Sequence, residues 1–232
     1  MTGESRPRKE FATRPYFFDH DKLEERSFPI GKMIVKGQYS PNGSLAVICK
    51  GKKGAGFHVC FKCGFATSER ALTKNTHNNS FGGKCLSPLK GPFDLGHTFK
   101  TDILLISFEE PKFDEVFREE DFWFSLLYAL LESASQTLQI RRLDLDGCLY
   151  PFGGKVALVL FDNVPGGAGH VKRIMEGQNL YEVFRVAKER MEKCTCGEET
   201  SCYGCLRNYQ NQFCHDHLKR GIVKDFLSRN LS

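Results

Sequence analysis

Long apolar runs are missing from this sequence of 232 residues. No stretch approaches the roughly 18 uncharged apolar residues that a membrane-spanning helix needs. The first ten residues are polar and lack the apolar centre of a signal peptide. These absences argue against a membrane protein and a secreted precursor, and they predict a cytoplasmic protein. Hydrophobic residues make up 41% and charged residues 26%, which is typical of a folded globular chain.

Acidic residues are scarce in one half of the chain. Residues 32–100 contain 11 Lys and Arg but only 2 Asp and Glu, a net charge of +9, whereas residues 101–232 carry −4. A basic surface of this kind suits nucleic acid, although a solvated basic face or an acidic partner protein explains it as well. The residues expected to contact a nucleic-acid backbone are Lys50, Lys52, Lys53 and Lys62.

The motifs of nucleotide-binding proteins are absent as well. Neither G-x-x-x-x-G-K-[ST] nor G-x-G-x-x-G occurs anywhere in the chain. The glycine-rich residues 165–169 follow an apolar strand and precede a helix, so a phosphate could rest there. A tight strand-to-helix corner is the favoured interpretation. The chain by itself is therefore not expected to hydrolyse ATP.

The hydrophobic pattern predicts an α+β fold, with a small mixed sheet, packed helices and zinc-stabilised Cys-rich loops. Residues 122–140 have the clearest helical period, and residues 156–161 form the most continuous apolar strand. Pro41-Asn42-Gly43 predicts a hairpin turn between strands 32–39 and 44–49. Further helices are expected at 170–176, 179–193 and 218–227, and further strands at 57–61, 103–108 and 143–149. The expected domains are an irregular N-terminal arm (1–30), a basic β-rich segment with a zinc knuckle (31–97) and a zinc-binding domain (98–232).

Cysteine, by contrast, is plentiful, with 10 residues. Clustered cysteines in a reducing compartment bind zinc more often than they form disulfides. Four of them fall within twelve residues that contain no aliphatic side chain: Cys194, Cys196, Cys202 and Cys205. Four thiolates complete a tetrahedral zinc site and leave no position for a catalytic water, so this site is expected to be structural. Cys214, His215 and His217 lie just beyond and are the possible substitutes.

A second cluster begins with the Cys-x-x-Cys pair of a zinc knuckle. Its expected ligands are Cys60, Cys63, His77 and Cys85. His58 and Cys49 compete for the fourth position. Metal is favoured over an empty or redox-active pair, because residues 64–92 are poor in aliphatic side chains and need another reason to fold.

Acidic residues at strand ends leave an enzymatic alternative open. Asp144, Asp146 and Asp162 lie at or near the ends of expected strands. Carboxylates so placed can bind magnesium in nucleases. Capping and turn contacts are the favoured interpretation of the three side chains.

Several segments occur in an order that resembles a known family. They are LGHTFKTD at 95–102, W-x-S-L-x-Y-A-L at 123–130, FDNVPGGAG at 161–169 and CLRNYQNQ at 205–212. Together they resemble the C-terminal zinc-binding domain of MrfA-type DEAD/DEAH-box helicases, which is also present in the helicase-partner protein of DISARM antiphage systems. The resemblance covers about residues 95–225.

This resemblance implies that Cys194, Cys196, Cys202 and Cys205 bind zinc beside a DNA-translocating motor. The chain lacks the Walker A and DExx motifs and is too short for two RecA-like lobes. We therefore expect a non-catalytic accessory subunit or C-terminal part of a DEAD/DEAH-box helicase, acting with DNA in repair or antiphage defence. The initial Met1 favours a separately encoded partner. The alternatives are a metal-dependent nuclease and a pure protein-interaction subunit.

Overall fold

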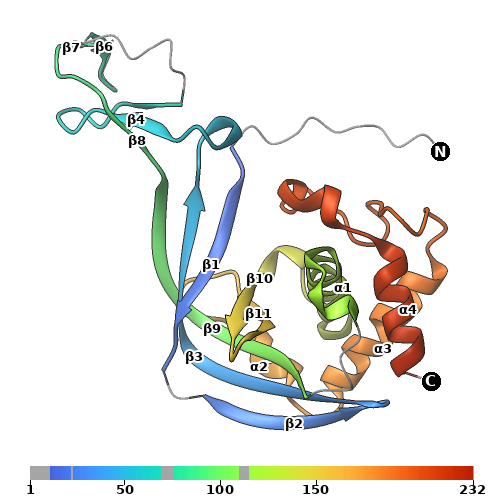
Figure 1. Cartoon of the computed structure of the whole chain (residues 1–232). Helices are drawn as coiled ribbons and strands as arrows, with labels where there is room; N and C mark the ends of the chain where they lie inside the picture. Colours follow the sequence, from blue (N-terminus) through green and yellow to red (C-terminus); the bar gives the residue numbers. More distant parts are fainter. Residues whose placement is uncertain (1–10, 22, 69–75, 110–114, 232) are drawn as a thin grey trace. The chain divides into compact units, whose positions relative to one another are not determined.

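The structure is a computed structural model that describes residues 11–21, 23–68, 76–109 and 115–231. The chain divides into two units (Figure 1). The core unit comprises Tyr16–Leu45 and Phe99–Ser232, and the knuckle unit comprises Ala46–Thr98 with residues 11–15. As a division into domains, the borders 1–30, 31–97 and 98–232 remain a prediction.

Six strands form the largest sheet, in the order β1-β3-β9-β11-β10, with β2 paired to β3 (Figure 1). Their bounds are β1 Thr13–Asp19, β2 Glu24–Ile30, β3 Met33–Cys49, β9 Leu95–Glu109, β10 Leu145–Phe152 and β11 Lys155–Asp162. The pairs β2/β3, β9/β11 and β10/β11 are antiparallel. Together with the helices, this sheet confirms the expected α+β class.

The central strands β9 and β11 are buried on both faces. Successive side chains of a strand point to opposite faces. Leu104 and Leu160 accordingly belong to the apolar core shared with the helices, whereas Ile103 and Phe161 belong to a second core on the opposite face. Burial on both sides explains why residues 103–106 of β9 and residues 156–161 of β11 are continuously apolar in the sequence instead of alternating.

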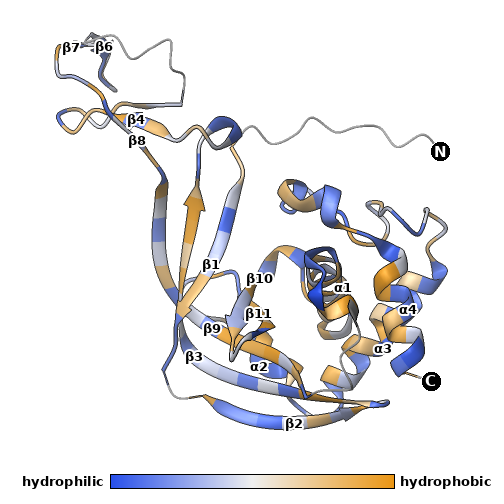
Figure 2. Cartoon of the chain, in the orientation of Figure 1, coloured by the Kyte–Doolittle hydropathy of each residue, from blue (hydrophilic) through white to orange (hydrophobic). Residues whose placement is uncertain are grey.

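Four helices complete the core unit: α1 Glu120–Leu138, α2 His170–Ile174, α3 Asn179–Lys193 and α4 Arg220–Asn230. Helix α1 packs against β10 and β11, and against α3 and α4. In Figure 2, α3 and α4 alternate between hydrophobic and hydrophilic stretches, as expected for helices with one buried face. Short 3-10 turns occupy Glu115–Arg118, Arg142–Asp144 and Gln212–His217. Among the described residues, no helix is both long and apolar enough to cross a bilayer.

The predicted hairpin at Pro41-Asn42-Gly43 is wrong, because β3 runs without interruption from Met33 to Cys49. Gly43 has an ordinary strand conformation and is not among the glycines with positive φ. A Cβ atom at this position would lie 2.2 Å from Cγ2 of Ile103 on the neighbouring strand. The glycine therefore allows two strands to pack closely. A close approach of strands and a tight turn both require glycine, so the sequence alone does not distinguish them.

The interpretation of residues 1–30 as an irregular arm is also wrong for the part that the structure describes. Strands β1 and β2 lie there, and Phe17 and Ile30 are buried. Residues 1–10 lie outside the described residues. Strand β2 contains Pro29, which is tolerated because β2 is an edge strand that pairs with β3.

The knuckle unit is built from short pieces. A 3-10 turn (Lys52–Gly54) is followed by β4 Phe57–Val59, β5 Ala66–Thr67, β6 His77–Asn78, β7 Lys84–Cys85 and β8 Lys90–Phe93. The strands form one sheet in the order β5-β4-β8 and a separate β6-β7 pair. Among the described residues of 46–98, the only buried hydrophobic side chains are Cys60 and Cys85. The unit thus lacks an apolar core of its own in this part.

Candidate metal centres

The first cysteine cluster, called the tetrad here, lies on the loop that follows α3. Its members are Cys194, Cys196, Cys202 and Cys205, and their sulfur atoms all lie within 4.8 Å of one another. Cys194 ends α3 in an extended conformation. The carbonyl of Cys202 accepts hydrogen bonds from the backbone N–H groups of Cys205, Leu206 and Arg207 at 3.0–3.2 Å, which closes a tight turn.

The sulfur spacing of the tetrad suits a tetrahedral metal. The Sγ atom of Cys194 lies 3.5 Å from that of Cys196 and 3.5 Å from that of Cys202. The Sγ atom of Cys205 lies 3.7 Å from that of Cys196 and 3.8 Å from that of Cys202. Zinc–sulfur bonds of about 2.3 Å in a tetrahedron place the sulfur atoms about 3.8 Å apart. All ten cysteines are free thiols, so no disulfide competes for these donors.

The four thiols do not ionise alike. Burial opposes ionisation of Cys194, but the N–H of Cys196 and the neighbouring thiols outweigh it and lower the pKa of Cys194. Burial raises the pKa of Cys205 well above its ordinary value. A bound cation favours the thiolate form of every ligand, and so would compensate the cost of burying Cys205 as an anion.

Two arginines brace the tetrad from outside. Arg220 is buried and donates to the carbonyl of Met191 at 2.8 Å and twice to the carbonyl of Cys196, at 2.8 and 3.1 Å. Arg190 donates to the carbonyl of Cys205 at 3.0 Å. The sequence does not reveal these contacts, because the acceptors are backbone carbonyls, which every residue has.

The substitutes considered for the tetrad have other partners. The buried thiol of Cys214 donates to the carbonyl of Asn211 at 3.3 Å. Nε2 of His215 lies 2.9 Å from Oδ1 of Asn211, and Nδ1 of His217 lies 2.7 Å from a carboxylate oxygen of Asp121. These three side chains hold the segment after the tetrad in place and are not in the group of four donors.

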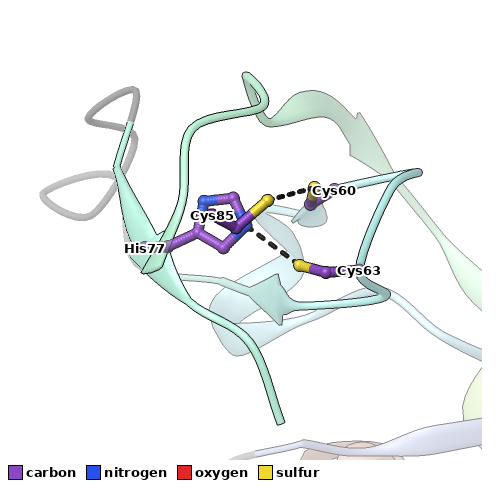
Figure 3. Close-up of side chains that lie close together, drawn as sticks. All are labelled: Cys60, Cys63, His77 and Cys85. Atoms are coloured by element: carbon purple, nitrogen blue, oxygen red, sulfur yellow. Dashed lines mark hydrogen bonds between the residues drawn. The ribbon is translucent and has the colours of Figure 1, made fainter. Parts of the chain in front are cut away.

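The second cluster comprises Cys60, Cys63, His77 and Cys85, with donor atoms that also lie within 4.8 Å of one another. Figure 3 shows the four side chains pointing toward one another. The Sγ atoms of Cys60 and Cys85 are 3.9 Å apart, and Nε2 of His77 lies 3.1 Å from Sγ of Cys63. The structure therefore brings His77 into the fourth position. Its two competitors, His58 and Cys49, are not in the group.

Local structure explains how these four donors meet. Cys60 and Cys63 flank the turn after β4, which is closed by hydrogen bonds from Gly64 N to the Cys60 carbonyl and from Cys60 N to the Phe65 carbonyl. His77 and Cys85 are directly opposite one another in the β6–β7 ladder. Burial opposes ionisation of Cys60, but backbone N–H groups of Cys63 and Lys62 outweigh it and lower the pKa of Cys60 to about 6.

The glycine-rich residues 165–169 form a corner closed by the chain's own carboxylates. Asp162 is fully buried and accepts hydrogen bonds from backbone N–H groups of Ala168 (2.6 Å), His170 (2.9 Å) and Val171 (2.9 Å). A Cβ atom on Gly167, which has φ +76°, would lie 2.4 Å from the carboxylate of Asp102. The N–H of Gly169 donates to Asp102 at 2.8 Å. Asp162 and Asp102 thus engage N–H groups that a phosphate would otherwise bind, which supports the corner interpretation.

The three carboxylates of the nuclease alternative have separate structural contacts. Asp144 pairs with Arg141 at 2.8 Å, and Asp146 accepts from the N–H of Gly147 at 2.9 Å. Asp162 caps the glycine-rich corner. Within the described residues, the two Cys-containing clusters are the only groups of three or more His, Cys, Asp or Glu side chains with metal-site spacing.

The four lysines expected to contact nucleic acid all belong to the knuckle unit. Lys50 and Lys53 are exposed. Lys53 lies within the 3-10 turn Lys52–Gly54 and has φ 54°. Lys62 is exposed between the two cysteines of the knuckle turn, and Lys52 is partly buried. The unit described here is basic and carries Asp94 as the one acidic side chain of the described residues 46–98.

The core unit is an α+β fold with four thiols in tetrahedral spacing after a packed helix, which is the arrangement of a zinc-binding domain. A family model described as the MrfA Zn-binding domain matches residues 126–206, the span that includes the tetrad. The resemblance found in the sequence is confirmed over this part of the chain.

Two relatives extend this finding. The chain is 27% identical to Druantia protein DruE of Escherichia coli (strain UMEA 4076-1), over 88% of this chain and 12% of DruE. Its fold resembles part of a crystal structure of DUF1998 helicase MrfA bound to DNA, with a TM-score of 0.51 and 13% identity, over 94% of this chain and 25% of that one. The chain thus spans a small part of each relative's length.

Proposed function

We propose that this chain is a non-catalytic zinc-binding module, acting as an accessory subunit or C-terminal part of a DNA helicase or translocase. The observation that carries the proposal is the tetrahedral spacing of four free thiols within the residues that match the MrfA Zn-binding domain. The relatives are several times longer than this chain, which supports a role as one part of a larger machine. The motor is supplied by another domain or subunit.

Zinc has a structural role in this proposal. The tetrad is the first site, and Cys60, Cys63, His77 and Cys85 form the second, so the protein binds up to two Zn²⁺ ions. Four protein ligands at each site leave no open position for a catalytic water. Binding energy at such sites is spent on ordering the loops that carry the ligands.

The knuckle unit supplies contacts to DNA through Lys50, Lys52, Lys53 and Lys62. Its excess of lysine favours the phosphate backbone, and such contacts carry no sequence information. The structural relative was crystallised with DNA, which supports a nucleic-acid partner here too. The setting that we propose is DNA repair or antiphage defence in the cytoplasm.

The test combines three measurements on the purified chain. Elemental analysis should find zinc, with a ratio near two ions per chain when both sites are filled. ATP hydrolysis should be undetectable until a DEAD/DEAH-box motor is added, and the chain should then raise DNA-stimulated hydrolysis by that motor. Folded protein without zinc, or hydrolysis by the chain alone that resists further purification, would contradict the proposal.

A further inference from the structure

The knuckle unit displays aromatic rings to solvent that its fold does not bury. Phe61 is 71% exposed and Phe81 is 97% exposed. An exposed phenylalanine ring leaves its apolar face available to a ligand, and aromatic rings are enriched where proteins bind partners. Each ring belongs to a turn beside a ligand of the second metal cluster.

Hydrogen bonds close both turns. Phe61 follows Cys60 in the turn closed by Gly64. Phe81 lies in the loop between β6 and β7, where Oδ1 of Asn79 accepts from the N–H groups of Phe81 and Gly83, both at 2.9 Å. Rings on ordered turns lose little conformational entropy when they bind, so they make efficient contact surfaces.

The rings have cationic neighbours. Nζ of Lys90 lies 5.8 Å from the centre of the Phe61 ring. Lys62 follows Phe61 directly, and Lys84 follows Phe81 by three residues; all three lysines are exposed. Phe93 contacts an edge of Phe61, with ring centres 5.8 Å apart, and steadies it. Aromatic faces interleaved with lysine match the alternating bases and phosphates of an open strand.

We propose that the knuckle unit binds a single strand of nucleic acid by stacking unpaired bases on Phe61 and Phe81, while Lys62, Lys84 and Lys90 contact the phosphates. This inference rests on the proposed nucleic-acid role of the unit and specifies its substrate. Bases in a duplex are already stacked on their neighbours, so projecting rings gain little from it. A single strand offers free base faces at no cost in pairing.

The experiment measures binding of labelled oligothymidylate, its ribose counterpart and a duplex to the zinc-loaded chain. Phe61→Ala and Phe81→Ala should each weaken single-strand binding by about 5- to 150-fold, the range of one lost base stack. Duplex binding and the salt dependence of single-strand binding should stay unchanged, because the lysines remain. Phe61→Trp and Phe81→Trp keep an aromatic face, so these variants should bind the single strand about as well as the parent chain. The ribose strand should behave like the deoxyribose strand, since stacking does not involve the 2′-hydroxyl.

Leu86 supplies the matched control. It is 74% exposed, lies beside Cys85 and has no aromatic face, so Leu86→Ala removes apolar surface without removing a ring. It should bind single strands like the parent. Equal losses in Leu86→Ala and the Phe variants would overturn the proposal and point to an apolar protein partner. Phe variants that bind like the parent would overturn it too.

Zinc content and duplex binding separate this inference from the proposed function. A parent chain that retains two zinc ions and binds duplex, but not oligothymidylate, would overturn the stacking inference alone. A parent chain without zinc or without affinity for either nucleic acid would overturn both.

Discussion

The two candidate metal centres have similar donors but very different surroundings. The tetrad adjoins the main apolar core, where Cys205, Leu206 and Leu218 are buried together with the helices. Arg190 and Arg220 hold its loop from outside. In the knuckle unit, the buried hydrophobic side chains of the described part are the ligands Cys60 and Cys85 themselves. The tetrad is thus attached to a large apolar core, whereas the second cluster supplies the buried hydrophobic side chains of its own unit.

This difference predicts that zinc orders a single loop at the tetrad but the whole unit at the second cluster. We expect zinc to order the loop that carries the tetrad, while the core unit keeps its fold through its own apolar packing. A unit without apolar packing has little else to offset the conformational entropy of folding. The loss of zinc should therefore remain local at the tetrad and extend through the whole unit at the knuckle.

The largest expected effect compares Cys85→Ser with Cys202→Ser. Each should lose one zinc ion, measured by elemental analysis. Structural zinc contributes about 10–16 kcal/mol in zinc-finger peptides, and the described part of the knuckle unit has no buried hydrophobic side chains besides its own ligands. Amide hydrogen exchange in Cys85→Ser should therefore become fast across residues 57–68 and 76–93. In Cys202→Ser, fast exchange should be confined to about residues 194–217, with α1 and α3 still protected.

Loss of protection in the core unit of Cys202→Ser would contradict this comparison. If Cys202→Ser also abolished protection in α1 and β11, the core would depend on zinc as the knuckle unit does. Ser is close to Cys in size, so the result would reflect the lost ligand and not a packing defect.

The next effect concerns the brace on the tetrad. Arg220→Ala leaves the carbonyls of Cys196 and Met191 without their donor, and one buried unsatisfied group costs about 1–3 kcal/mol. Groups that orient metal ligands typically contribute 10- to 100-fold to metal affinity. Competition with a chelator should show a loss of this size at the tetrad and none at the knuckle. Arg220→Lys, which keeps the charge but not the forked donors, should recover only part of it.

A smaller effect tests the contribution of lysine to nucleic-acid binding. Lys53→Ala with Lys62→Ala should weaken binding equally across sequences and flatten the log–log salt slope by up to about 1.8, since each phosphate contact contributes about 0.7 to 0.9. Lys193→Ala with Lys224→Ala in the core unit is the control and should leave the slope unchanged. An unaltered slope in the knuckle variant would mean that these lysines meet something other than phosphate.

The smallest effect concerns Asp121, which ties the segment after the tetrad to α1. It accepts from Nδ1 of His217 at 2.7 Å and pairs with Lys219 at 3.0 Å. Burial raises its pKa, but these partners outweigh burial and lower the pKa below the ordinary 3.8. Its stabilisation is therefore present above pH 3.8 and is lost as the pH falls through the lower folded value.

Asp121→Asn should cost no more than about 1 kcal/mol at neutral pH, because the pair is partly exposed. The difference from the parent in urea denaturation should shrink as the pH approaches 3.8 and below. A difference that grew on acidification would contradict this assignment.

Local patterns predicted much of the core unit. Helical spacing located α1 and α3, and an unbroken apolar run located β11, because burial repeats with the period of the element. The hairpin at Gly43 failed because a close approach to Ile103 requires the same residue as a turn. Strands β1 and β2 were missed because edge strands tolerate charge and proline.

The candidate ligands were predictable for a different reason. Cys-x-Cys and Cys-x-x-Cys turns place donors together through local geometry, so spacing alone selects the tetrad. His77 could not be distinguished from His58 or Cys49 by spacing, because its position depends on the β6–β7 pairing. Arg220 and Asp162 act on backbone groups distant in sequence or within a loop, and only the folded chain shows those contacts.

The placement of His77 opposite Cys85 has a consequence for how the knuckle assembles. A strand pair of two residues each has few hydrogen bonds with which to choose its register. Displacing one strand by a single residue turns its side chains to the other side of the ladder. A misaligned pair would then present one donor instead of two, and a four-coordinate ion could not be enclosed. Metal capture at this cluster would thus select the correct alignment during folding, and a chain that has paired wrongly would stay open until it realigns.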